Sequence, residues 1–117
     1  MTINGIDLEF SIFDADCVER YENAIKKMQE QAVDLPDNST AAEAIRKECE
    51  LYIAFFDEVF GAGTSYSIFS GRTNIAACHD AFYQVIEQIE AEGEERKKIN
   101  AIRNAKYGAD NWREQTS

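Results

Sequence analysis

A glycine-punctuated stretch over residues 60–74 separates two long helical patterns, and this interruption most constrains how the chain can fold. Gly61 follows an apolar helical run and can supply the positive φ that often ends a helix. Thr73 and Asn74 stand just before the next apolar run, and both residue types are favourable N-caps. The sequence therefore predicts a structured connection over residues 61–73, with a short helix or turn, that closes one end of a helical core.

Two residues within this connection, Ile68 and Phe69, are too apolar for a simple solvated loop. The interpretation that we favour makes them a lid tucked onto the helical core. The alternative makes them part of an apolar contact surface for another protein, which requires an exposed patch.

Apolar residues recur at three- and four-residue spacing in three segments, which predicts helices over residues 15–33, 40–60 and 74–105. Pro36 disfavours helical geometry in the residue before it, which places the end of the first helix before it. Thr40 opens a Thr-Ala-Ala-Glu capping box at the start of the second helix. The apolar stripes of the second and third helices include Cys49, Tyr52, Ile53, Phe56, Val59, Phe60, Ile75, Cys78, Phe82, Val85, Ile86 and Ile89.

The N-terminal segment, residues 1–13, has the pattern of a β-hairpin. Asn4-Gly5 is a strong signal for a tight hairpin turn, since both positions need positive φ. The apolar residues that alternate with polar ones after the turn are Ile6, Leu8, Phe10 and Ile12. A lone short hairpin is marginal in water, so it must pack on the helices or pair with another chain. An exposed strand edge here predicts a homo-oligomer formed by strand addition.

The expected fold is therefore mainly α: a three-helix bundle-like single domain over residues 1–105, with an N-terminal β-hairpin and a short helix or turn in the central loop. The third helix is expected to extend past the bundle, because its pattern turns from apolar to charged at Glu90. Residues 106–117 are expected to form a mobile tail. Trp112 in that tail has two interpretations, a docking contact for another protein or local packing.

The charge distribution is uneven along the chain, whose formal net charge is −10. Residues 1–95 carry 20 acidic and 6 basic residues, whereas residues 96–117 carry 2 acidic and 6 basic residues. An acidic body argues against nucleic-acid binding, which needs basic residues to neutralise phosphates. No apolar run reaches the length of a membrane span, and the N-terminus lacks a signal-peptide pattern, so we expect a cytoplasmic protein.

Candidate chemical groups are sparse. Cys17, Cys49 and Cys78 are widely spaced and lie on apolar helix faces, so we interpret them as buried hydrophobic residues rather than metal or redox groups. His79 is the sole histidine, and adjacent helical residues point about 100° apart, so a nucleophile pair with Cys78 is not implied. We expect no enzymatic activity, no cofactor and no metal site.

Two further motifs have a structural interpretation. Asp14 and Asp16 have the spacing of a metal-binding pair, but acidic residues are also favoured at a helix start, where Asp16 fits a capping box. Gly61-Ala62-Gly63 begins like a phosphate-binding loop, but the dinucleotide fingerprint needs a glycine at the position of Tyr66 and a preceding strand.

Several blocks resemble, in the same order, a family of small uncharacterised acidic proteins encoded in the tail modules of phages and prophages of Gram-positive bacteria. The blocks are Ile3-Asn4-Gly5-Ile6-Asp7-Leu8-Glu9-Phe10, Phe13-Asp14-Ala15-Asp16, Phe60-Gly61-x-Gly63-Thr64-x(4)-Phe69-x-Gly71-x-x-Asn74, and the helix from Asn74 to Ile89 with Cys78 and Ala81-Phe82. The resemblance covers about residues 1–92. It carries over no catalytic or binding residue.

The resemblance implies a role in tail morphogenesis similar to that of tail assembly chaperones, small helical proteins that keep the tape-measure protein soluble. The expected function is thus a non-enzymatic phage protein in tail assembly, or a minor tail component. The expected partners are tape-measure or tail-tube proteins, in the host cytoplasm or in the virion. The alternative is an acidic prophage-encoded regulator that inhibits a host protein by mimicking nucleic-acid charge.

Overall fold

Four α-helices and a two-stranded antiparallel sheet make up the part of the chain that the computed structural model describes, residues 1–31 and 38–108. The elements are β1 (Thr2–Ile3), β2 (Ile6–Asp7), α1 (Ala15–Glu30), α2 (Ala41–Phe60), α3 (Thr64–Phe69), α4 (Ile75–Arg103) and the π-helix η1 (Asn104–Gly108). The mainly α fold with an N-terminal hairpin and a short helix in the central loop is confirmed. Within the described residues, none of the helices has both the length and the apolar character needed to cross a bilayer.

The hairpin turns at Asn4 and Gly5, whose φ angles of 53° and 78° are both positive, as the Asn-Gly signal predicts. Ile3 pairs with Ile6 across this turn, and Ile3 is fully buried in the core. The paired strands are shorter than the predicted span of residues 1–13. Leu8 still bonds to Met1, but because no residue precedes Met1 in this sequence, the chain beyond Leu8 has no strand to pair with among the described residues, and Phe10 packs on the helices instead.

Helix α1 begins at Ala15 with Asp14 as its N-cap, so the expected cap at Asp16 is wrong by two residues. The Asp14 side chain accepts hydrogen bonds from the backbone N–H groups of Asp16 and Cys17. The helix ends at Glu30, three residues before the predicted end at residue 33.

Helix α2 lies against both α1 and α4, and its aromatic last turns form the centre of the core. The side chain of Thr40 accepts a hydrogen bond from the backbone N–H of Glu43, which confirms the predicted cap. At the other end, Gly61 has a φ of 115°, so a glycine is required where the helix stops. Phe55, Phe56 and Val59 are almost fully buried.

The central connection contains α3, and it closes the core as predicted. Ile68 and Phe69 of α3 are buried, and the Phe69 ring packs edge-on against Phe56, with 5.5 Å between the ring centroids. Ser70 adopts a left-handed conformation just after α3, and the connection leads from there to the N-cap of α4, Asn74.

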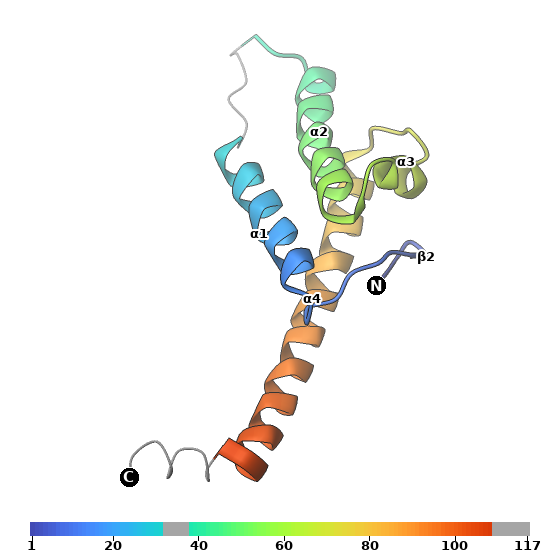
Figure 1. Ribbon diagram of the computed structural model, residues 1–117. Helices are drawn as coiled ribbons and strands as arrows, with labels where there is room; N and C mark the ends of the chain where they lie inside the picture. Colours follow the sequence, from blue (N-terminus) through green and yellow to red (C-terminus); the bar gives the residue numbers. More distant parts are fainter. Residues whose placement is uncertain (32–37, 109–117) are drawn as a thin grey trace.

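Helix α4 is the longest element, and its second half projects beyond the rest of the molecule as an arm (Figure 1). Its predicted extent, residues 74–105, agrees with the observed bounds to within two residues. The projection makes the molecule elongated, 68 by 32 by 20 Å. Its radius of gyration is 19.0 Å, whereas a compact chain of this length has roughly 13 Å. Of the expected tail, residues 106–108 belong to η1, and the remainder lies outside the described residues.

Candidate protein-binding surface

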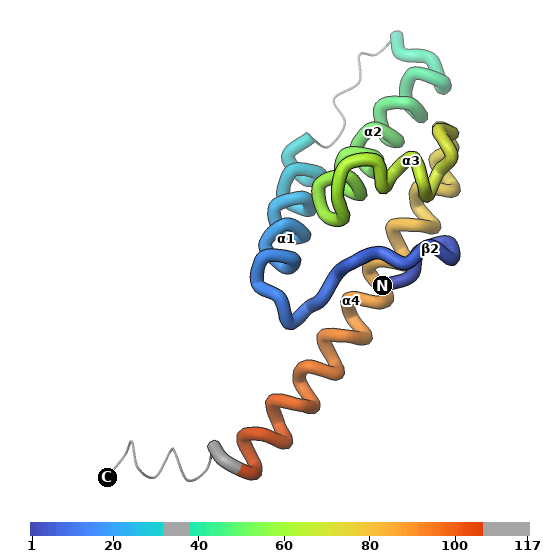
Figure 2. Tube along the Cα trace, turned by 45° about the vertical axis from the view of Figure 1, so that its right-hand side comes forward, coloured from blue at the N-terminus to red at the C-terminus, as the bar shows by residue number. Residues whose placement is uncertain are grey.

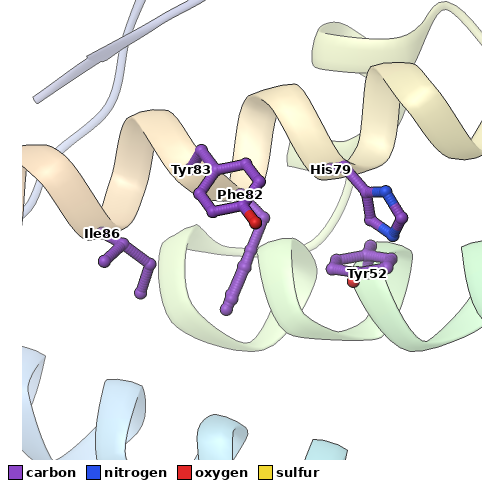
Figure 3. Close-up of a pocket in the computed structure, with 5 residues that line it drawn as sticks. All are labelled: Tyr52, His79, Phe82, Tyr83 and Ile86. Carbon is purple, nitrogen blue, oxygen red and sulfur yellow. The ribbon is translucent and has the colours of Figure 1, made fainter.

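A shallow recess between α2 and α4 is lined mainly by aromatic side chains (Figure 3). Tyr52 comes from α2, and His79, Phe82, Tyr83 and Ile86 come from two successive turns of α4. The cavity volume is about 220 Å³. That is below the usual range for a small-molecule site, roughly 300–1,000 Å³, but it is large enough to receive one or two apolar side chains of a protein partner.

The recess is the exposed end of a continuous aromatic cluster. The Tyr52 ring lies 5.4 Å from the ring of His79 and 5.4 Å from that of Phe82, measured between centroids. Phe82 in turn contacts the buried ring of Phe55 at 5.0 Å, edge-on. Edge-to-face pairs of this kind hold aromatic rings in fixed orientations. The floor of the recess is therefore rigid, because each ring is fixed by the next one inward.

Carboxylates lie near parts of this aromatic surface. Partial burial, and then the nearby Glu48 carboxylate, raise the pKa of Tyr52 above its usual value. Glu87 adds an exposed carboxylate on α4, next in sequence to the lining residue Ile86. An apolar floor with carboxylates nearby suits a partner segment that carries apolar residues flanked by lysine or arginine.

His79 lies at the border of the recess, exposed and packed edge-on against Tyr52. Among residues 1–31 and 38–108, no group of three or more His, Cys, Asp or Glu side chains is arranged to hold a metal ion.

The three cysteines are buried within the protein. Burial, and then the interaction with the neighbouring Cys49 thiol of α2, raise the pKa of Cys78 on α4 to about 12. A thiol held neutral at physiological pH is a weak nucleophile. Cys49 and Cys78 pack in the core as buried hydrophobic residues, as the sequence predicts.

The contact residues expected from the sequence occupy different places. Ile68 and Phe69 lie in the core, so the lid interpretation describes them, and they contribute no exposed patch. Trp112 lies outside the described residues. The structure therefore does not bring Ile68 or Phe69 to the recess.

The sequence interpretation missed the recess itself. Tyr52, Phe82 and Ile86 were assigned to core stripes, and Tyr83 was not singled out, although it is 67% exposed. One signal pointed to the surface. A tyrosine within an apolar stripe usually keeps its hydroxyl near water, which places Tyr52 at an edge of the core rather than at its centre.

Fold and surface together define a small, mainly α-helical protein with an extended terminal helix and an aromatic recess with carboxylates nearby. The chain belongs to DUF6673, a family of unknown function, whose match covers residues 4–116. Comparisons with curated proteins and with solved structures found no match. The family match continues past residue 92, where the resemblance described above ends, so the arm and the C-terminal residues are part of the family's sequence pattern.

Proposed function

We propose that this protein is a non-enzymatic component of phage tail assembly, or a minor tail component, that binds other phage proteins in the host cytoplasm. The observation that carries the protein-binding part is the aromatic recess of Tyr52, Phe82, Tyr83 and Ile86, a rigid apolar surface open to solvent. The phage part is supported by the resemblance of the hairpin and of the central glycine block to proteins of tail gene modules.

The recess fits an apolar segment with basic flanks, contributed by a tape-measure or tail-tube protein. One or two apolar side chains enter the recess, and a lysine or arginine residue meets the carboxylate of Glu48 beside Tyr52. Masking such segments until the tail tube polymerises is the task of a tail assembly chaperone.

Co-expression with tape-measure and tail-tube proteins of a phage or prophage that encodes this chain tests the proposal. The wild-type chain is expected to form a soluble, co-purifying complex with one of them. Tyr83→Glu places a charge at the recess and is expected to weaken the complex tenfold or more, which is about 1.4 kcal/mol. The matched control is Tyr66→Glu on α3, since Tyr66 is also an exposed tyrosine but lies away from the recess. Equal binding by both variants would show that the recess does not bind the partner. Absence of any complex would refute the tail proposal.

The acidic charge of residues 1–95 favours a second candidate, an inhibitor of a basic host protein. Such an inhibitor would bind a nucleic-acid-binding host protein in competition with DNA or RNA, and increasing salt would weaken that binding. The two candidates differ in their dependence on Tyr83, because charge mimicry does not need an aromatic recess.

A further inference from the structure

The arm of α4 has few contacts with the rest of residues 1–31 and 38–108. Every residue from 94 to 103 is exposed, and these residues extend away from the three shorter helices in both views (Figures 1 and 2). Isolated helices shorter than about 12–15 residues are marginal in water. A helix that continues this far past its docking surface is therefore well suited to be stabilised by a second surface.

The charges of the arm are divided into two blocks of opposite sign. Residues 90–95 contain four glutamates and no basic residue, and residues 96–103 contain four basic residues and no acidic one. The acidic block is Glu90, Glu92, Glu94 and Glu95, and the basic block is Arg96, Lys97, Lys98 and Arg103. One ion pair within the helix, Lys97 with Glu94 at 3.4 Å, joins the blocks where they meet.

The arm also carries exposed apolar residues. Ile99 is 42% exposed and Ile102 is 66% exposed. Ile99 follows the buried Val85 by fourteen positions, which is two heptads, so it lies on nearly the same side of the helix as the face that docks on the body. The docking face of α4 thus continues onto the arm, where the described part of the chain no longer covers it.

A groove lies where the arm leaves the body. It has a volume of about 400 Å³ and is lined in part by Ile12, Phe13 and Val18 from the N-terminal segment and α1, and by Arg96 and Asn100 from the arm. Phe13 is 57% exposed. The Arg96 side chain bridges the two walls by donating a hydrogen bond to the Ile12 carbonyl oxygen at 3.5 Å. The groove and the arm isoleucines therefore form adjoining apolar surfaces.

We propose that the arm binds the arm of a second copy of this chain, with the two α4 helices antiparallel. In this orientation the acidic block of each arm lies beside the basic block of the other, and both sets of pairs are attractive. In a parallel pair, glutamates would face glutamates and basic residues would face basic residues, which is unfavourable. Ile99 and Ile102 of each copy pack toward the junction groove of the other and cover Phe13.

An antiparallel pair places the two bodies at opposite ends of the joined arms, with both recesses outside the arm–arm contact. The inference goes beyond the proposed function and does not depend on it, since it uses residues other than those of the recess. If both hold, the assembly presents two partner-binding surfaces, and binding to a polymer of repeating subunits gains from avidity.

The test uses the full chain and analytical ultracentrifugation across a range of concentrations. The wild type is expected to form a dimer that weakens as salt is raised from about 0.1 to 1 M, where the Debye length falls to about 3 Å. The double variant Glu94→Lys/Glu95→Lys and the double variant Lys97→Glu/Lys98→Glu are each expected to lose dimerisation tenfold or more. Mixing the two variants restores a dimer, because one arm then carries six basic and two acidic residues and the other carries six acidic and two basic residues.

Two further measurements separate this arrangement from others. Ile102→Glu is expected to weaken the dimer, whereas Ile45→Glu, a control at an exposed isoleucine on α2, is expected to leave it unchanged. Small-angle X-ray scattering is expected to give the dimer a maximum dimension well above the 68 Å length of one copy. A wild type that stays monomeric at about 100 μM, charge variants that still dimerise alone, or a dimer close to 68 Å long would each overturn the proposal. Tail-protein binding by monomeric arm variants would leave the proposed function standing by itself.

Discussion

The carboxylate of Asp57 accepts two hydrogen bonds from Ser65, one from the backbone N–H to Oδ1 at 2.9 Å and one from the hydroxyl to Oδ2 at 3.0 Å. Asp57 lies in the last turn of α2, and its backbone oxygen also accepts a hydrogen bond from the N–H of Gly61. One residue thus takes part in both the end of α2 and the start of α3. This pairing positions α3 so that Ile68 and Phe69 enter the core.

Asp57→Ala is expected to lower the free energy of unfolding by about 2 kcal/mol, because it leaves the partly buried Ser65 N–H without its acceptor. Ser65→Ala removes one bond and is expected to cost about 1 kcal/mol. The control is Glu58→Ala, which breaks a partly exposed ion pair with Lys27 and is expected to cost less than about 1 kcal/mol. Urea denaturation of the three variants gives the comparison, and equal losses for Asp57→Ala and Glu58→Ala would contradict it.

Phe69 and Tyr66 lie on the same short helix, and they provide a test of the lid. Phe69→Ala is expected to lower the free energy of unfolding by about 3 kcal/mol or more, since it opens a cavity beside Phe56. Tyr66→Ala removes a ring that is 71% exposed and is expected to cost under about 1 kcal/mol. The measurement is the denaturant midpoint of each variant; a small effect at Phe69 would mean that the connection is not held against the core.

Two glutamines of α4 bind the outer edge of β1. The Gln88 side chain accepts from the Thr2 N–H at 3.0 Å and donates to the Thr2 carbonyl oxygen at 2.6 Å, and Gln84 accepts from the Asn4 N–H at 2.9 Å. These contacts take the place of a further strand at this edge. The predicted oligomer by strand addition stays a prediction, and it would have to use the edge of β2 instead.

The double variant Gln84→Ala/Gln88→Ala is expected to free that edge. Amide hydrogen exchange at Thr2 and Asn4 should rise about fivefold or more, since each N–H loses a bond worth about 1 kcal/mol. The amide of Leu8, which donates to the Met1 carbonyl oxygen within the hairpin, serves as the internal reference. If the exchange rates of all three amides rise equally, the glutamines hold the whole hairpin in place rather than only its edge.

The raised pKa of Cys78 predicts how the free energy of unfolding changes at alkaline pH. Its pKa is raised from 9.0 to about 12 in the folded protein, so between these values the unfolded state loses the thiol proton while the folded state keeps it. The contribution of this thiol to the free energy of unfolding is fully present below about pH 9. It falls as pH rises, by at most about 1.4 kcal/mol per pH unit. Cys78→Ala is expected to be less stable at pH 8 but to lose less between pH 8 and 10.5. Guanidinium unfolding at both pH values measures this, and identical pH slopes would exclude the thiol as the cause.

Gly93 and Gly61 allow the effect of backbone conformation to be compared at two positions with equal free space. A Cβ added at either position meets no atom within 4 Å, so space is available at both. Gly93 is helical, and Gly93→Ala is expected to stabilise the arm by about 0.5–1 kcal/mol, seen as increased helical circular dichroism. Gly61 has a φ of 115°, and Gly61→Ala is expected to destabilise the fold by about 1–2 kcal/mol, seen as a lower Tm. Shifts of the same sign in both variants would contradict this account.

Features decided within a few neighbouring residues were open to prediction from the sequence. The turn at Asn4-Gly5, the cap at Thr40, the helix stop at Gly61 and the extent of α4 each depend on local φ angles, hydrogen bonds or apolar spacing. The errors were also local. The cap of α1 moved to Asp14 because two acidic candidates stand close together, and β2 is short because a strand cannot extend beyond its partner.

The tertiary structure alone decided what the sequence left open at longer range. Thr2 and Gln88 meet across 86 residues, and whether Ile68 and Phe69 turn inward or outward depends on how α3 is placed. The same packing leaves Ile99 exposed, although it follows the buried Val85 by two heptads. Periodicity marks which side of a helix is apolar, but coverage of that side depends on the lengths and crossing of the other helices. The aromatic recess and the unsupported arm both follow from that coverage.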